Sequence, residues 1–214
     1  MIVTIDGPAG AGKSTIAKGV ANRLGFAFLD TGAMYRCVTL AALEAGADFQ
    51  DATSLHAIAT DCQIEFSFDK VWLNQQDVTQ AIRTPQVTKH IRFVADHPGI
   101  RSWLNQQQRR IAADRDIVTE GRDQGTEVFP EAECKVFLTA SIEERARRRQ
   151  RQLAQSGTEI PLQQLIAEQN ERDRGDQQRQ MGRLQPAPDA QLLFTDGMTP
   201  EQVIQQICHW AADR

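Results

Sequence analysis

The sequence lacks the features expected of a membrane protein or of a domain held together by disulfides. Its four cysteines, Cys37, Cys62, Cys134 and Cys208, lie far apart and form no C-x-x-C pair. This spacing indicates neither a metal site nor a disulfide framework, and it favours reduced, mostly buried thiols. No apolar run approaches the ~18 residues of a membrane span, and no basic segment followed by an apolar one opens the chain. We therefore expect a cytoplasmic protein that does not associate with membranes.

The chain also lacks an excess of positive charge. Its formal net charge is −4, so the molecule as a whole does not attract nucleic acid, and any anion site must come from a local arrangement of groups. A length of 214 residues suggests one domain, or one domain with sizeable insertions. With 41% hydrophobic and 24% charged residues, the composition is that of an ordinary globular protein with a buried core.

Short apolar runs are the main sign of secondary structure. Five of them are predicted to be buried strands: residues 2–5, 26–29, 117–119, 136–138 and 192–194. Most are followed by a helical pattern, and this alternation predicts a parallel α/β sheet with helices on both faces. The last helix is the clearest, because Thr199 can cap it and Pro200 suits its first position. Its predicted inner face consists of Val203, Ile204, Ile207 and Trp210.

The strand–helix alternation breaks twice. Between residues 37 and 97 we predict a helix over residues 38–45 and strand segments at 64–68 and 71–73, which together look like an insertion. Residues 143–183 are rich in Arg and Gln and poor in apolar residues, and we interpret them as a polar helical segment. The predicted organisation is therefore a core (1–36 and 97–214), an insert (37–96) and a lid segment (143–183) within the core.

Residues 7–14 read G-P-A-G-A-G-K-S and match the phosphate-loop pattern G-x-x-x-x-G-K-[ST]. The motif follows a predicted strand and precedes a predicted helix, so a chance glycine-rich turn is the weaker interpretation. Backbone N–H groups of such a loop and the helix N-terminus bind phosphate, the lysine reaches the β- and γ-phosphates, and the hydroxyl binds Mg²⁺. The predicted nucleotide site consists of Gly7, Gly10, Ala11, Gly12, Lys13, Ser14 and Thr15, with Ser14 as the metal ligand.

The loop alone does not identify the reaction, because switches, motors and kinases share it. The sequence has no N-K-x-D motif for reading guanine, which argues against a GTPase switch. A motor or recombinase usually needs a longer chain and an acidic residue that closes an apolar strand. Glu120 does close the strand at 117–119, so this argument is only suggestive.

A small kinase also needs an acceptor site, and two polar segments follow predicted strands. Residues 30–36 (D-T-G-A-M-Y-R) follow the second strand, and residues 120–126 (E-G-R-D-Q-G-T) follow the third. The carboxyl ends of parallel strands are the usual place for ligands, and the fork of Arg36 suits a phosphate. Either segment could instead be a loop with an internal salt bridge, but two of them beside a phosphate loop favour a site.

Five of the arginines in the predicted lid lie within seven residues of a predicted helix: Arg145, Arg147, Arg148, Arg149 and Arg151. Helical spacing places Arg145, Arg148 and Arg149 on one face. They could form a solvated face paired with Glu143 and Glu144, a nucleic-acid patch, or a lid that neutralises charge on the transferred phosphoryl group. The negative net charge of the chain and the scarcity of nearby aromatic residues disfavour the nucleic-acid patch. We expect at least one of these arginines to act in phosphoryl transfer, with Arg145 and Arg148 as candidates.

Taken together, the motifs resemble those of the bacterial cytidylate kinases. Besides the phosphate loop, the resemblance rests on L-D-T-G-A-M-Y-R at 29–36, D-V-T and I-R-T at 77–79 and 82–84, G-R-D and G-T at 121–123 and 125–126, V-F-L and E-E-R-A at 136–138 and 143–146, and E-R-D at 171–173. These matches run in order through nearly the whole chain. They imply a five-stranded parallel core, a lid and an enlarged insert with its own small sheet. They also imply transfer of the γ-phosphate of Mg²⁺-ATP to CMP or dCMP. We expect the chain to act as a monomer.

The resemblance also implies roles for single residues. Arg36 and Arg122 would hold the acceptor phosphate, while Arg101 and Asp123 would read the cytosine ring, which offers acceptors to an arginine and an amine to a carboxylate. Arg172, Asp176 and Arg179 would surround the ribose and the phosphates, with Arg172 also acting in transfer. Asp30, Thr31 and Tyr35 would line the acceptor pocket.

Two positions depart from the family pattern. Glu120 stands where Asp is expected, which lengthens a carboxylate near the metal. Arg92 stands where Ser is expected, in the part of the insert that reads the base. If Arg92 points into the pocket it offers only donors, and the preference for CMP over UMP should narrow. If it points to solvent, the preference should be unaffected.

Two other functions remain open at this point. One is a kinase that phosphorylates UMP or another small molecule. The other, from a different class, is a nucleotide-dependent protein that binds RNA or DNA through the arginine-rich segment.

Overall fold

A computed structural model describes residues 1–67, 70–155 and 157–214. The chain forms two compact units, one made of residues 1–28 and 114–214 and the other of residues 29–113. The second unit contains the whole predicted insert, 37–96, together with residues 29–36 and 97–113. No helix within the described ranges is long and apolar enough to cross a bilayer.

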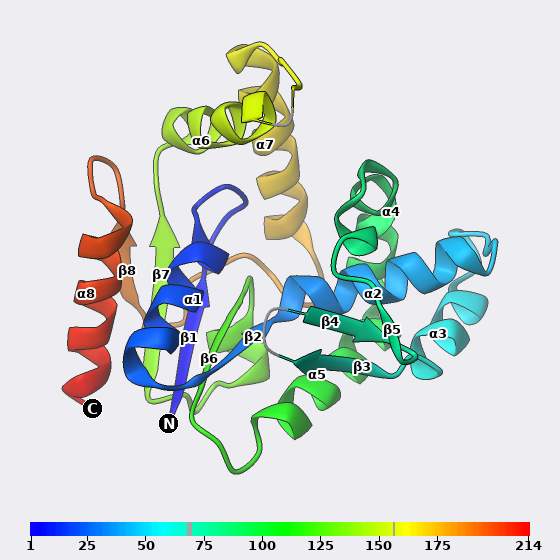
Figure 1. Cartoon of the computed structure of the whole chain (residues 1–214), viewed down its shortest axis with the longest axis horizontal. Helices are drawn as coiled ribbons and strands as arrows, with labels where there is room; N and C mark the ends of the chain where they lie inside the picture. Colours follow the sequence, from blue (N-terminus) through cyan, green and yellow to red (C-terminus); the bar gives the residue numbers. More distant parts are fainter. Residues whose placement is uncertain (68–69, 156) are drawn as a thin grey trace. The chain divides into compact units, whose positions relative to one another are not determined.

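The first unit is built around a five-stranded sheet (Figure 1). Its strands are β2 (Ala27–Asp30), β6 (Ile117–Gly121), β1 (Ile2–Asp6), β7 (Cys134–Thr139) and β8 (Gln191–Phe194), in that spatial order. The N-terminal strand β1 lies in the centre, parallel to both β6 and β7, and β7 runs parallel to β8. All five predicted strands are confirmed.

Two helices, α1 (Lys13–Leu24) and α8 (Pro200–Ala212), lie side by side over one face of this sheet (Figure 1). Alternate residues of β1, such as Val3 and Ile5, point into the core that the helices cover. The predicted inner face of α8 is confirmed, since Val203 and Ile207 are buried and the other two residues pack against the same core. Hydrophobic burial of this stripe is what fixes α8 on the sheet.

The opposite face of the sheet carries polar side chains of β1, including Thr4 and Asp6. Here a short π-helical turn, Gln124–Val128, packs against β1 and β6. The buried carboxylate of Asp6 accepts the backbone N–H groups of Gln124 at 2.9 Å and Gly125 at 2.7 Å. Part of the polar segment predicted to follow the third strand is therefore a helical turn fixed to the central strand.

The predicted polar segment at 143–183 is largely helical. It forms α6 (Ile142–Gln155) and α7 (Leu162–Gln178), which pack against each other. Residue 156 of the predicted segment lies outside the described residues, and residues 179–183 follow the end of α7.

The second unit combines helices with a small antiparallel sheet. Its helices are α2 (Thr31–Glu44), α3 (Ala52–Thr60), α4 (Pro85–Ala95), α5 (Pro98–Ala112) and the short 3₁₀ helix η1 (Ala81–Arg83), and its strands are β3 (Ile64–Ser67), β4 (Lys70–Leu73) and β5 (Gln76–Asp77). The strands pair in the order β3-β4-β5. The predicted small sheet is confirmed, although residue 68 of the predicted strand lies outside the described ranges.

The helix predicted over 38–45 begins seven residues earlier than expected, and residues 31–36 of the predicted acceptor segment form its first turns. Asp30 caps the helix, because its carboxylate accepts the N–H of Ala33 at 2.9 Å. An aspartate at this position satisfies one of the N–H groups that a helix end leaves unpaired.

Candidate active site

The phosphate loop joins the end of β1 to the start of α1. Gly12, the residue that precedes α1, has φ 88 and no side chain that could cap the helix. The N–H groups of the first turn are therefore available to an anion, which the positive end of the helix also attracts. The structure confirms the strand–loop–helix context of residues 7–14.

Lys13 is buried over this loop. Its ammonium group donates to the carbonyl of Pro8 at 2.9 Å, and its side chain folds back across the turn. Burial lowers the pKa of Lys13 to about 7, and the nearby charges of Arg122 and Arg172 push it in the same direction, while Glu120 and Asp6 act against them. A bound phosphate would favour the charged form of the lysine.

Ser14, in the first turn of α1, meets Glu120, near the carboxyl end of β6. The hydroxyl of Ser14 donates to Oε1 of Glu120 at 2.8 Å, and Glu120 is buried at the end of β6. A hydroxyl and a carboxylate are the oxygen ligands that Mg²⁺ prefers, so this pair fits the metal that the phosphate loop implies. The longer side chain of Glu120, in place of the expected Asp, still reaches Ser14.

The segment after β6 contributes Arg122, which pairs with Asp176 from α7. Nε of Arg122 donates to Oδ2 of Asp176 at 2.8 Å, and Arg179 pairs with the other carboxylate oxygen at 2.8 Å. Burial would raise the pKa of Asp176, but these two arginines outweigh it and lower the pKa. Asp176 thus orients two guanidinium groups, an arrangement suited to binding a phosphate or a sugar hydroxyl. Asp123, beside Arg122, is buried.

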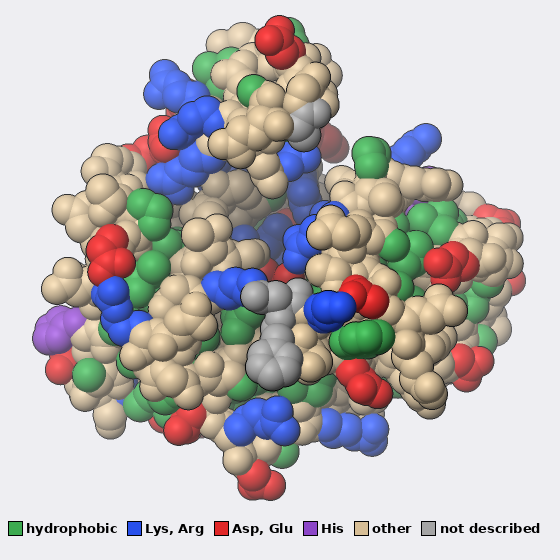
Figure 2. All heavy atoms as spheres, viewed as in Figure 1, with side chains coloured by type: hydrophobic (Ala, Val, Ile, Leu, Met, Phe, Trp, Pro, Cys, Tyr) green, Lys and Arg blue, Asp and Glu red, His purple; other side chains and the backbone are tan. Residues whose placement is uncertain are grey.

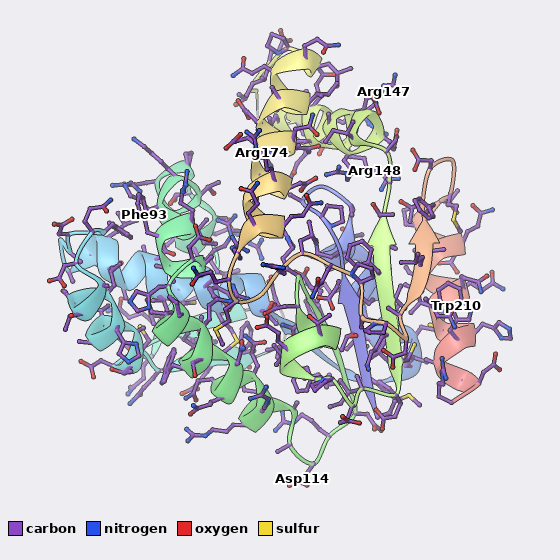
Figure 3. The ribbon with its side chains drawn as sticks, turned by 180° about the vertical axis from the view of Figure 1, so that it is seen from behind. Phe93, Asp114, Arg147, Arg148, Arg174 and Trp210 are labelled. Atoms are coloured by element: carbon purple, nitrogen blue, oxygen red, sulfur yellow. The ribbon has the colours of Figure 1, made fainter. Side chains whose placement is uncertain are left out.

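The arginines of α6 divide into two groups. Arg145 and Arg148 point toward the phosphate loop, where they donate to the carbonyls of Ala9 at 3.0 Å and Ala11 at 3.3 Å. Arg148 also bonds to Thr195 and Glu144. Arg147 points away from the loop (Figure 3), and positive side chains gather along α6 in Figure 2.

The remaining two arginines of the predicted cluster stay at the helix surface. Arg149 contacts Gln152, and Arg151 pairs with Glu144. The predicted face of 145, 148 and 149 is therefore only partly brought to the loop. Arg172, from α7, is exposed, and its charge acts on Lys13 and Asp176.

The second unit brings the other predicted site residues together in and around α2. Arg36 donates to the carbonyl of Ile82 and to the hydroxyl of Thr88, both at 3.0 Å. Asp30, the cap of α2, pairs with Arg83 at 3.5 Å. The I-R-T motif at 82–84 therefore has a structural basis, because two of its residues hold Arg36 and Asp30.

Arg101, from α5, lies over the ring of Tyr35 with its guanidinium carbon 5.4 Å from the ring centroid. It is buried and donates to the carbonyl of Ala95 at 2.9 Å. Thr31 and Tyr35 are also buried. Arg92, on α4, is exposed to solvent in this structure.

A family model described as cytidylate kinase matches residues 3–213. The chain belongs to the cytidylate kinase family. A cytidylate kinase of Rhodopirellula baltica is 57% identical over 207 residues, covering 97% of this chain and 90% of that protein. One of Pelotomaculum thermopropionicum is 45% identical over 210 residues, covering 96% and 93%. As a member of the family, the chain is a phosphotransferase of the nucleoside monophosphate kinase type.

Some relatives are longer. A bifunctional pantoate ligase/cytidylate kinase of a Synechococcus strain is 46% identical over 213 residues, and the match spans 96% of this chain but 39% of that protein. Among solved structures, a shikimate kinase of Bacteroides thetaiotaomicron has a TM-score of 0.51 at 14% identity, covering 99% of this chain and 98% of the other. That likeness shows a shared fold.

Sequence reasoning missed several residues that shape the site. Asp173 and Gln169 of α7 contact the residues around the phosphate loop, and Thr195 anchors Arg148. Asp6 fixes the turn after Arg122 and Asp123. Only Asp173 carried a signal, since it ends the E-R-D motif at 171–173.

Proposed function

We propose that the chain transfers the γ-phosphate of Mg²⁺-ATP to CMP or dCMP, giving ADP and CDP or dCDP. The observation that carries the proposal is the buried Lys13 above a phosphate loop whose Ser14 pairs with Glu120, in a member of the cytidylate kinase family. An oxygen of the acceptor phosphate forms a bond to the γ-phosphorus. The bond from that phosphorus to the bridging oxygen breaks, and ADP keeps the electron pair.

The donor half of this reaction uses the first unit. Backbone N–H groups of the loop bind the phosphates of ATP. The residues of this nucleotide site are Gly7, Gly10, Ala11, Gly12, Lys13, Ser14 and Thr15. Ser14 and Glu120 would hold Mg²⁺, which neutralises charge on the β- and γ-phosphate oxygens. Lys13, Arg148 and Arg172 add positive charge for the transferred group. Arg145, also predicted to act in transfer, contacts the loop itself through the carbonyl of Ala9.

We assign acceptor roles to residues of each unit separately. Arg36 and Arg122 bind its phosphate, Arg101 and Asp123 read its base, and Arg172, Asp176 and Arg179 bind its sugar and phosphates. Asp30, Thr31 and Tyr35 line its pocket. Support comes from the hydrogen bonds that already orient Arg36 and Arg122.

The reaction needs no strong general base, because the attacking phosphate oxygen is already anionic. Positioning and electrostatic stabilisation supply most of the rate, and turnover should fall in the usual kinase range of roughly 1–100 s⁻¹. We further propose that the enzyme works as a cytoplasmic monomer in pyrimidine nucleotide metabolism, without nucleic-acid or membrane partners.

One assay distinguishes this function from its alternatives. ADP release from Mg²⁺-ATP is measured with CMP, dCMP, UMP, AMP or shikimate as acceptor, for the natural chain and for Lys13→Met. We expect release with CMP and dCMP by the natural chain and nearly none by the variant. Faster release with UMP or shikimate would favour another acceptor. Acceptor-independent behaviour with strongly salt-dependent affinity for nucleic acid would favour the binding protein.

A further inference from the structure

A buried ion pair connects both α6 and α7 to the phosphate loop. Arg145 donates to Oδ2 of Asp173 at 2.6 Å, and the side chains are 8% and 13% exposed. The same Nη1 of Arg145 donates to the carbonyl of Ala9 at 3.0 Å. The other carboxylate oxygen of Asp173 accepts the N–H of Ala9 at 3.4 Å. The pair therefore contacts Ala9 on both sides, at its N–H and at its C=O.

The packing around the next residue shows how closely the two helices approach this loop. Gly10 has φ 76, and a Cβ added to it would lie 2.8 Å from Nε2 of Gln169 and 3.3 Å from Cβ of Arg145. Gln169 in turn donates to the carbonyl of Arg145 at 3.2 Å. A side chain at position 10 would meet α6 and α7, so the loop and both helices are fitted to each other.

We propose that Arg145 and Asp173 are positioning residues that fix the Ala9 peptides and thereby the conformation of the phosphate loop. Ala9 presents a donor and an acceptor, and the pair supplies the matching acceptor and donor. Fixing Ala9 holds the following N–H groups of the loop where phosphate oxygens bind. Arg145 thus acts through the loop, rather than on the transferred phosphoryl group. The inference rests on the proposed role of the loop as the ATP site.

A test must separate positioning from folding, because removing one partner leaves the other charge buried and unpaired. Replacing both charges by apolar side chains of similar size is often tolerated, so the test variant is Arg145→Met with Asp173→Leu. The matched control is Glu171→Gln, two residues away on α7. It removes a carboxylate that pairs with Arg174 at the exposed surface (Figure 3).

Two readouts are compared: the Kd of a non-hydrolysable ATP analogue by calorimetry, and the KM values for ATP and CMP. In the double variant we expect the Kd of the analogue and the KM for ATP to rise about tenfold, as for the loss of one charge-assisted hydrogen bond. The KM for CMP should stay within about twofold of that of the natural chain. The control should match the natural chain. A folded double variant that binds the analogue as tightly as the natural chain would overturn the proposal.

If the double variant does not fold, two measurements remain. Arg145→Lys keeps a charge beside Asp173 but cannot donate in the geometry of the guanidinium, so ATP should bind more weakly to it. Unchanged affinity would contradict the proposal. In the natural chain the Ala9 amide should be protected from hydrogen exchange, and exchange at the rate of an unstructured peptide would also contradict it. Calorimetry stays informative even if CMP proves not to be the acceptor.

Discussion

Lys13 is a charged side chain held in a place that disfavours charge. Its burial lowers its pKa from 10.5 to about 7, so between these values the folded chain binds fewer protons than the unfolded chain. Stability contributed by this residue therefore rises with pH through that window, and the cost of burying the charge is fully present below pH 7. The negative charge of a bound triphosphate would offset this loss of stability, which is present in the enzyme without nucleotide.

The stability of Lys13→Met should reveal this cost. Near pH 6.5 we expect the variant to unfold at a higher denaturant concentration than the natural chain, although it transfers almost no phosphate. The gain in free energy of unfolding should be on the order of 1–3 kcal/mol. The gain should shrink near pH 9.5, because the natural lysine is then largely neutral in the folded state. Urea titrations at the two pH values measure it. An equal gain at both would mean that packing, not charge, is responsible.

Arg92 also lends itself to a prediction about a single residue. Its side chain is exposed on α4, and surface substitutions usually change free energies by less than about 0.5 kcal/mol. We therefore expect Arg92→Ser to alter the ratio of kcat/KM for CMP and UMP by no more than about twofold. If Arg92 contacted the base, Arg92→Ser should raise that ratio about tenfold, and such a rise would contradict the expectation that Arg92 does not read the base.

Among the elements, α8 begins with a reciprocal pair of hydrogen bonds between side chains and backbone. Thr199 accepts the N–H of Gln202, whose side chain reaches back to the N–H of Thr199 and completes a capping box. Thr199→Ala should lower the free energy of unfolding by about 1 kcal/mol, whereas Thr199→Ser, which keeps the hydroxyl, should lower it much less. Denaturant midpoints of the three chains measure the difference. If Thr199→Ser lost as much stability as Thr199→Ala, the hydroxyl of Thr199 would not be the group that stabilises the helix start.

The elements of the sheet were predictable because burial on both faces leaves short, continuous apolar runs. The start of α2 was not, since Asp30, Thr31 and Gly32 are residues of turns as well as of helix caps. The π-helical turn Gln124–Val128 was also missed. Its shape depends on the carboxylate of Asp6, more than a hundred residues earlier, and no local pattern records such a contact.

The same distinction holds for the candidate site as a whole. The phosphate loop and the arginines were visible as motifs, because phosphate recognition needs particular residue types at short spacing. The contacts that orient them join distant segments: Asp173 lies 164 residues from Ala9, and Arg122 lies 54 residues from Asp176. Spacing alone cannot show which carboxylate binds substrate and which one holds an arginine in place.

The central position of β1 has a consequence for how the chain is made. Ile2–Asp6 is translated before residues 29–113, yet its neighbours in the sheet are β6 and β7, which are translated only after that whole continuous unit. That unit can fold during synthesis, as domains generally do. Until β6 and β7 are made, the backbone N–H and C=O groups of the apolar strand β1 have no strand to pair with. A strand that is made before the second unit thus reaches its native place only after that unit is complete, and chaperones can bind it throughout this interval.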